Sequence, residues 1–253
     1  PAYKEIEHLP FDQRLASMRS PEMKARLLSD TPSTDNPFVK AVLRNFSKMF
    51  PLSDPPDYEP TPDQSLGAQA KRLNRRPEEL AYDWLLQDNG RALILFPFLN
   101  YASDSLAPSF EMMSHPHTVL GLGDGGAHVG MICDGSFPTS MLTHWTRDRS
   151  RGGRLPLEWV IRAQTHATAS AVGLLDRGLL QPGFKADINV IDYTRLTLQR
   201  PSVAYDLPAG GRRLVQHAQG YDATIVSGAV TYRHGEATKA LPGKLLRGAR
   251  QAP

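Results

Sequence analysis

A carboxylate set among glycines is the residue of this chain whose type and surroundings best fit chemistry. Residues 118–128 read Thr-Val-Leu-Gly-Leu-Gly-Asp-Gly-Gly-Ala-His, so an apolar run of strand type delivers Asp124 at its end. Glycines on both sides let a ligand and the backbone approach closely. Such a carboxylate can bind a divalent metal and accept the proton of a metal-bound water. Because Asp-Gly is also a common turn dipeptide, the spacing alone leaves a turn former as an alternative.

The segment after Asp124 carries further side chains that could take part. His128 could contact a substrate or orient the carboxylate by a hydrogen bond. Arginine guanidinium groups flank Gly152-Gly153 and could clamp a substrate carboxylate by paired hydrogen bonds, although a solvated charged loop is the alternative. These groups belong to Arg147, Arg149, Arg151 and Arg154, of which we select Arg147 and Arg151 with His128 as candidate substrate-binding residues.

Several other groups are weaker candidates. Cys133 and His144 could form a nucleophilic pair, although a small buried thiol is the ordinary state of such a cysteine. His115 and His117 have the spacing of two metal ligands. They precede the apolar run, however, so they should lie at the opposite end of a strand from Asp124. Asp187 and Asp192 bracket a short apolar stretch and are expected to cap a strand, and His166 is expected to be structural within its helix.

The composition limits the class of protein. With 253 residues and 40% hydrophobic content, the chain can form one large domain or two small ones with a real core. Lys and Arg number 29 against 26 Asp and Glu, a mixed charge that does not indicate nucleic acid binding. The longest apolar run is far shorter than the about 18 residues that cross a bilayer. No signal peptide or membrane span is expected, and a single cysteine, Cys133, favours the cytoplasm.

The elements that must position Asp124 form three segments. Residues 1–90 are polar and interrupted by proline, and we interpret them as a mostly helical insertion or lid. Residues 91–180 are predicted as β-α-β-loop-α, with strands buried on both faces as in a parallel sheet. Residues 181–253 are predicted as a small all-β segment and a tail. The expected helices cover residues 11–29, 36–49, 77–87, 104–114 and 157–174, and the expected strands cover 91–99, 118–123, 186–192, 223–227 and 229–233.

Several of these stretches together resemble one family. They are Gly-Asp-Gly at 123–125, Gln-Thr-His-Ala-Thr at 164–168, Gly-Leu-Leu-Asp-Arg-Gly-Leu-Leu-Gln-Pro-Gly at 173–183 and Ala-Asp-Ile-Asn-Val-Ile-Asp at 186–192. In these motifs the chain resembles the D-aminoacylase group, the N-acyl-D-amino-acid deacylases, of the amidohydrolase superfamily. The likeness covers residues 91–240. It implies a (β/α)₈ barrel whose eighth strand ends at Asp124, together with a β-sandwich to which residues 181–253 contribute.

The resemblance also implies the chemistry. The expected enzyme is a zinc-dependent amidohydrolase with one or two zinc ions, acting on a small-molecule substrate, an N-acyl-D-amino acid. Asp124 would be a metal ligand and the catalytic acid/base. The family's other metal ligands come from early and middle barrel strands, and none can be matched in this chain.

The chain contains too few strand–helix units for a whole barrel. A barrel needs eight strand–helix units, and only two can be counted, so either the rest of the barrel is not in this chain or the fold is a different one with a short sheet. Because the first residue is also Pro and not Met, we expect the chain to be the C-terminal portion of a longer enzyme. Two alternatives stay open. The chain could be catalytically inert or could need a separate N-terminal chain as partner, or it could belong to a related hydrolase of cyclic amides or ureido groups.

Overall fold

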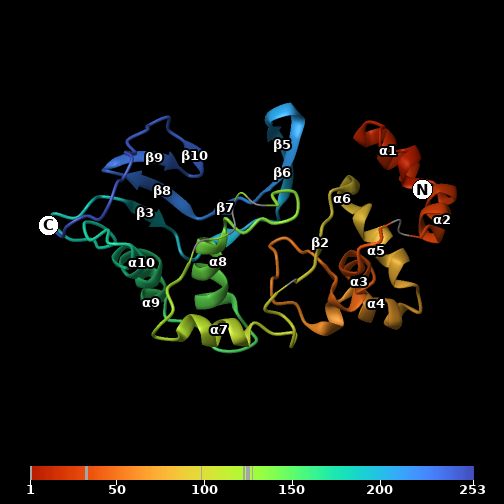
Figure 1. Ribbon diagram of the computed structural model, residues 1–253, viewed down its shortest axis with the longest axis horizontal. Coiled ribbons are helices and arrows are strands. Elements are labelled where there is room, and N and C mark those ends of the chain that lie inside the picture. Colours follow the sequence, from red (N-terminus) through yellow and green to blue (C-terminus); the bar gives the residue numbers. More distant parts are fainter. Residues whose placement is uncertain (1, 32–33, 98, 122, 124–125, 127) are drawn as a thin grey trace. The chain divides into compact units, whose positions relative to one another are not determined.

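The structure is a computed structural model that describes residues 2–31, 34–97, 99–121, 123, 126 and 128–253. The chain divides into two compact units (Figure 1). The first comprises Pro1–Ser53 and Asp57–Leu106, and the second comprises Asp54–Pro56 and Ala107–Pro253. Within the described residues, no helix has both the length and the apolar character needed to cross a membrane.

The first unit is mainly helical. The predicted helix over residues 11–29 is divided at Pro21, where the chain starts a new helix and the Ser20 hydroxyl accepts a hydrogen bond from Met23 N at 3.1 Å. Phe50 and Tyr101 are buried in its core, with their rings edge to face. The unit's elements are η1 (Ala2–Glu5), α1 (Phe11–Met18), α2 (Pro21–Ser29), α3 (Pro37–Leu43), η2 (Phe46–Lys48), β1 (Phe50–Pro51), η3 (Pro62–Gln64), α4 (Leu66–Leu73), α5 (Pro77–Leu85), α6 (Gln87–Gly90) and β2 (Ile94–Leu95).

The second unit combines helices with antiparallel strands. Its helices are α7 (Ala107–Ser114), α8 (Phe137–Thr143), the π-helix η4 (His144–Asp148), α9 (Leu157–Arg162), the π-helix η5 (Ala163–Ala167), α10 (Thr168–Ala171) and η6 (Pro208–Gly210). Its strands are β3 (Ile188–Ile191), β4 (Thr197–Leu198), β5 (Ser202–Leu207), β6 (Gly211–Val215), β7 (Ala218–Gln219), β8 (Tyr221–Val226), β9 (Ala229–Arg233) and β10 (Glu236–Ala237). One sheet has the order β10-β9-β8-β3, and β4–β7 and β5–β6 form two-stranded ribbons.

In the C-terminal half of this unit, the observed helices and strands agree with several of those predicted from the sequence. α9, η5 and α10 run on directly from residue 157 to residue 171, which confirms the predicted helix there. The strand expected at residues 186–192 is β3, and the expected hairpin is β8–β9. Its turn residues Ser227 and Gly228 have φ of 51° and 80°, and positive φ at both positions suits the twist of a two-residue hairpin.

The predicted barrel portion is not reproduced among the described residues. β2 covers only Ile94–Leu95 and pairs antiparallel with β1, where a parallel partner was expected. No strand is formed by the described part of residues 118–123, and Val119 is exposed. An apolar run becomes a barrel strand only when neighbouring strands satisfy its backbone on both sides, and the described residues supply none. The helix predicted from residue 104 begins at Ala107, because Asp104 has a positive φ.

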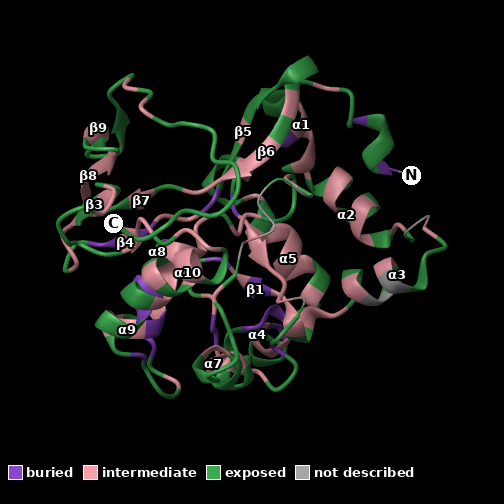
Figure 2. Ribbon diagram, turned by 60° about the vertical axis from the view of Figure 1, so that its left-hand side comes forward, coloured by how far each residue is buried: buried purple, intermediate pink, exposed green. Residues whose placement is uncertain are grey.

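The core of the second unit lies between its helices and short strands. Val160 on α9 and Leu196 are fully buried, and Leu198 on β4 is nearly so (Figure 2). Gly220 passes close to this core, since an added Cβ would lie 2.6 Å from Leu196 Cα. Its carbonyl accepts a hydrogen bond from Asp192 N at 2.8 Å, and its φ is +96°. The backbone therefore crosses the core at a point that only glycine fits.

Replacing Gly220 by Ala should lower the free energy of unfolding by roughly 2 kcal/mol or more, because the new methyl group meets backbone atoms and the φ is strained. Urea unfolding followed by circular dichroism measures this loss. Gly243→Ala is the matched control, since a Cβ there meets nothing within 4 Å. Equal unfolding midpoints for the two variants would contradict the assigned close approach.

Candidate active-site loop

Asp124, the predicted catalytic residue and metal ligand, lies outside the described residues. The described residues on either side show how its segment is held. A Cβ added to Gly123 would lie 3.0 Å from Asp134 O and 3.2 Å from the Phe137 ring, so any side chain there would force these neighbours at the start of α8 to shift. Gly126 has a φ of +123° and open space around it. Glycine at these two positions therefore has a structural reason.

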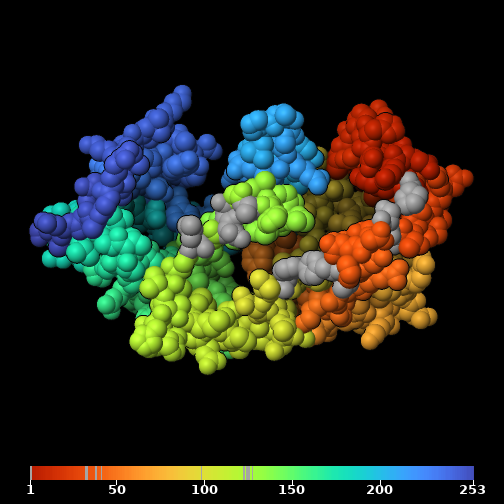
Figure 3. Space-filling model, in the orientation of Figure 1, coloured from red at the N-terminus to blue at the C-terminus, as the bar shows by residue number. Residues whose placement is uncertain are grey.

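His128 begins a turn that connects the segment to β6. Its φ is 50°, its side chain is exposed, and its carbonyl accepts hydrogen bonds from Met131 N at 2.8 Å and Ile132 N at 3.0 Å. The next residue, Val129, accepts a hydrogen bond through its carbonyl from Leu214 N of β6 at 2.7 Å. The described part of the loop accordingly lies against the β5–β6 hairpin (Figure 3).

The other end of the loop is fixed at the start of α8. Ser136, which precedes α8, hydrogen-bonds through its hydroxyl to the Gln216 side chain. One turn later, the Thr139 and Tyr221 hydroxyl groups lie 2.8 Å apart. Burial raises the pKa of Tyr221, so this phenol stays protonated at neutral pH. We refer to residues 126–136 as the active-site loop after the role predicted for Asp124, and the described part of this segment leads into α8 and contacts β6.

Cys133 lies half-buried in this loop. Burial raises the pKa of its thiol, the negative charge of Asp134 raises it further, and Arg213 acts in the opposite direction. A raised pKa leaves little thiolate at neutral pH, which does not suit a nucleophile. His144, its imagined partner, opens η4 with its ring edge to face against Trp145 at 5.0 Å between centroids.

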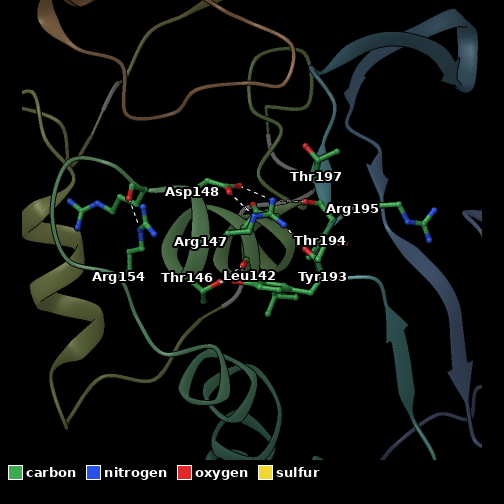
Figure 4. Close-up of polar contacts among 12 residues, drawn as sticks. Leu142, Thr146, Arg147, Asp148, Arg154, Tyr193, Thr194, Arg195 and Thr197 are labelled. Carbon is green, nitrogen blue, oxygen red and sulfur yellow. Dashed lines mark hydrogen bonds and ion pairs between the residues drawn. The ribbon is translucent and has the colours of Figure 1, made fainter.

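Arg147, predicted to bind substrate, is engaged within the chain (Figure 4). Its guanidinium donates to both carboxylate oxygens of Asp148, at 2.6 and 2.9 Å. It also donates to the main-chain carbonyls of Tyr193 and Leu196, the latter at 2.7 Å. The hydrogen bonds to Asp148 raise the pKa of Arg147. The Thr146 hydroxyl lies 2.6 Å from that of Tyr193, so η4 is fastened to the segment before β4.

Arg149 is the most deeply buried of the four loop arginines, at 2% exposure. Its guanidinium lies over the Trp145 ring at 4.8 Å and the Phe110 ring at 5.5 Å, and it donates to Gly153 O at 2.8 Å. A Cβ on Gly152 would meet this guanidinium at 2.8 Å, and one on Gly153 would meet the Phe110 ring at the same distance. The Gly152-Gly153 pair is therefore required by packing around the cation.

The structure also places the remaining candidates. Arg154 donates through Nε to Arg149 O at 2.7 Å, and Arg151 is half-buried. His115 and His117 are exposed, with ring centroids 5.3 Å apart.

The two aspartates around β3 act as expected. Asp187 accepts a hydrogen bond from Ser227 N at 2.8 Å. Asp192 accepts from Thr194 N and Arg195 N, at 3.1 and 3.2 Å. The Thr194 and Arg195 side chains hydrogen-bond the same carboxylate and lower the pKa of Asp192 far below its usual range. Both carboxylates thus cap the ends of β3.

A metal site would need several His, Cys, Asp or Glu side chains close together among the residues that the structure describes. Nowhere in that part of the chain do three His, Cys, Asp or Glu side chains come together closely enough to hold a metal ion. The described side chains therefore do not fit a complete zinc site.

The sequence reasoning missed the β5–β6 hairpin, whose strand β6 contacts the active-site loop. The strands expected from the sequence include none between residues 193 and 222, and so leave out both strands of this hairpin. The alternating pattern of Ser202-Val203-Ala204-Tyr205 and the glycines at the tip are the signals that could have found it.

Comparison with known proteins identifies the family. A model of the amidohydrolase family matches residues 3–232, and the chain therefore belongs to this family. No curated protein and no solved structure matches it. Members of the family are hydrolases that act on C–N bonds and typically depend on a metal. The match includes the segment with Asp124, the active-site loop and most of the strands of the second unit.

Replacing Arg149 by Ala should lower the free energy of unfolding by roughly 3 kcal/mol, because two aromatic rings and Gly153 O lose the buried cation that packs against them. Arg162→Ala on the exposed side of α9 is the control and should change stability little. The urea concentrations at which the two variants are half unfolded measure the difference in stability. If the two variants have the same urea midpoint, the structural role assigned to Arg149 is wrong.

Cys133 should react slowly with iodoacetamide at pH 7.5 in the folded chain, because burial keeps its thiol protonated. The rate should rise as the pH approaches the raised pKa. Mass spectrometry follows the reaction, and the same chain unfolded in urea is the control that should react at the ordinary rate. Faster alkylation in the folded chain would restore Cys133 as a candidate nucleophile.

Proposed function

We propose that this chain serves in the hydrolysis of N-acyl-D-amino acids, with Asp124 as the catalytic acid/base. One observation carries the proposal: the amidohydrolase family match spans residues 3–232 and includes a carboxylate between glycines. The resemblance of residues 164–192 to the D-aminoacylase group supports the choice of substrate. A small-molecule acyl amino acid is thus the proposed binding partner.

The reaction needs one group that can both take and give a proton. Water adds to the amide carbon and loses a proton to a base, the C–N bond breaks, and the departing nitrogen takes up a proton. A carboxylate can accept the first proton and return it to the nitrogen, so one residue serves both steps. Asp124 is proposed for this role because its glycine neighbours leave room for a substrate.

The substrate contacts follow from the described loop. His128 is exposed beside the segment of Asp124 and is proposed to contact the substrate. Arg151 remains a proposed substrate-binding residue. Arg147 is a weaker proposal than the sequence suggested, since four of its hydrogen bonds go to Asp148 and to main-chain carbonyls.

Zinc is proposed as the metal, with Asp124 as the ligand that this chain supplies. The described residues do not complete a zinc site. This favours a second candidate, in which the chain is inert alone and acts only with a separate chain that brings further ligands. Metal analysis separates the two candidates, because stoichiometric zinc in the isolated chain contradicts the second.

Asp124→Asn should lower the turnover of N-acetyl-D-amino acids by about 100-fold or more, because the amide cannot take or give the proton. Release of the free amine measures turnover, and the circular dichroism spectrum should be unchanged. Asp12→Asn, on the exposed first turn of α1, is the matched control and should keep full activity. Retained activity in the Asp124 variant would overturn the assignment.

A further inference from the structure

Arg212 differs from the other arginines around the active-site loop in having its charge available. Arg213 is paired with Asp206 through two hydrogen bonds of 2.7 Å on one face of the β5–β6 hairpin. Arg147 is bound to Asp148, and Arg149 is buried against two neighbouring rings. Arg212 is exposed, and among the residues that the structure describes its side chain forms no hydrogen bond or ion pair.

The position of Arg212 brings it to the loop. Its Nε lies 3.9 Å from the place of a Cβ on Gly130, two residues after His128. Two residues farther along β6, Leu214 N donates to Val129 O at 2.7 Å and fixes the strand against the loop. The guanidinium therefore stands beside the segment that follows Asp124, and the main-chain hydrogen bond holds it there.

Opposite Arg212, a bulge in β5 places Tyr205 and Asp206, and Asp206 is already bound to Arg213. Side chains two residues apart share a face of a strand, so Arg212 lies on the face of Leu214 and of its cross-strand partner Val203. Val203 is 45% exposed and Met131, in the loop, is 78% exposed. A cation that shares its strand face with an exposed Val203, and approaches the loop next to an exposed Met131, suits a ligand with one carboxylate beside an apolar group.

We propose that Arg212 binds the carboxylate of the substrate and so selects acyl amino acids over neutral amides. The proposal rests on the function proposed above and adds the group that recognises the substrate's charge. A guanidinium presents two parallel N–H donors to a carboxylate, a geometry that a lysine ammonium cannot reproduce. Because Asp206 already neutralises Arg213, Arg212 supplies the uncompensated charge of the hairpin.

The test measures binding in an Asp124→Asn background, so that the ligand is not consumed. N-acetyl-D-leucine and its neutral analogue N-acetyl-D-leucinamide are titrated into the full chain by calorimetry. With Arg212 present, the carboxylate should bind about tenfold more tightly than the carboxamide, and added salt should weaken this preference. Arg212→Gln should abolish the preference, and Arg212→Lys should keep part of it.

Arg233→Gln is the matched control, since Arg233 is also exposed but lies on β9, in a different hairpin. It should keep the full preference. An unchanged preference in Arg212→Gln, or no preference in the parent chain, overturns the inference. Loss of turnover in Asp124→Asn together with unchanged binding in Arg212→Gln leaves the proposed function standing and removes only the inference. If Arg212→Gln loses the preference but the natural chain hydrolyses no substrate, the inference about Arg212 stands and the proposed function is removed.

Discussion

Burial of the Arg149 guanidinium against the neighbouring rings of Phe110 and Trp145 is the interaction on which the second unit most depends. It joins α7 to η4 and determines the path of residues 149–154, because the chain can close around the cation only where side chains are absent. Arg147, two residues earlier, fastens the same π-helix to the main chain before β4. A buried cation stacked on rings keeps a fixed place, whereas a cation in water does not.

These contacts explain why a run of arginines was hard to interpret from sequence. Spacing shows that four guanidinium groups lie near Gly152-Gly153, but a charge that binds a ligand and a charge that fills a core look alike in a sequence. The distinction depends on Phe110 and Tyr193, which lie roughly 40 residues before and after the run. Sequence predicts local structure well, and it does not show which distant ring or carbonyl meets a given side chain.

The fold shows the same difference between features that local sequence determines and features that depend on distant residues. The helix over residues 157–171, strand β3 and the β8–β9 hairpin were predicted because periodicity and turn residues specify them locally. The expected strand at residues 118–123 was not found among the described residues, because a strand in a parallel sheet requires neighbours from other parts of a chain. The role of Asp124 came from a motif and from family likeness, and it stays a prediction.

The two-stranded β5–β6 hairpin has a consequence for how this chain can change over generations. A lone pair of strands contributes little to a buried core, whereas Arg149, Val160 and Leu196 lie elsewhere and carry the packing. Substitutions along the hairpin can therefore accumulate with small loss of stability. In such an arrangement ligand preference can diverge among descendants while the scaffold and the carboxylate proposed for catalysis stay the same.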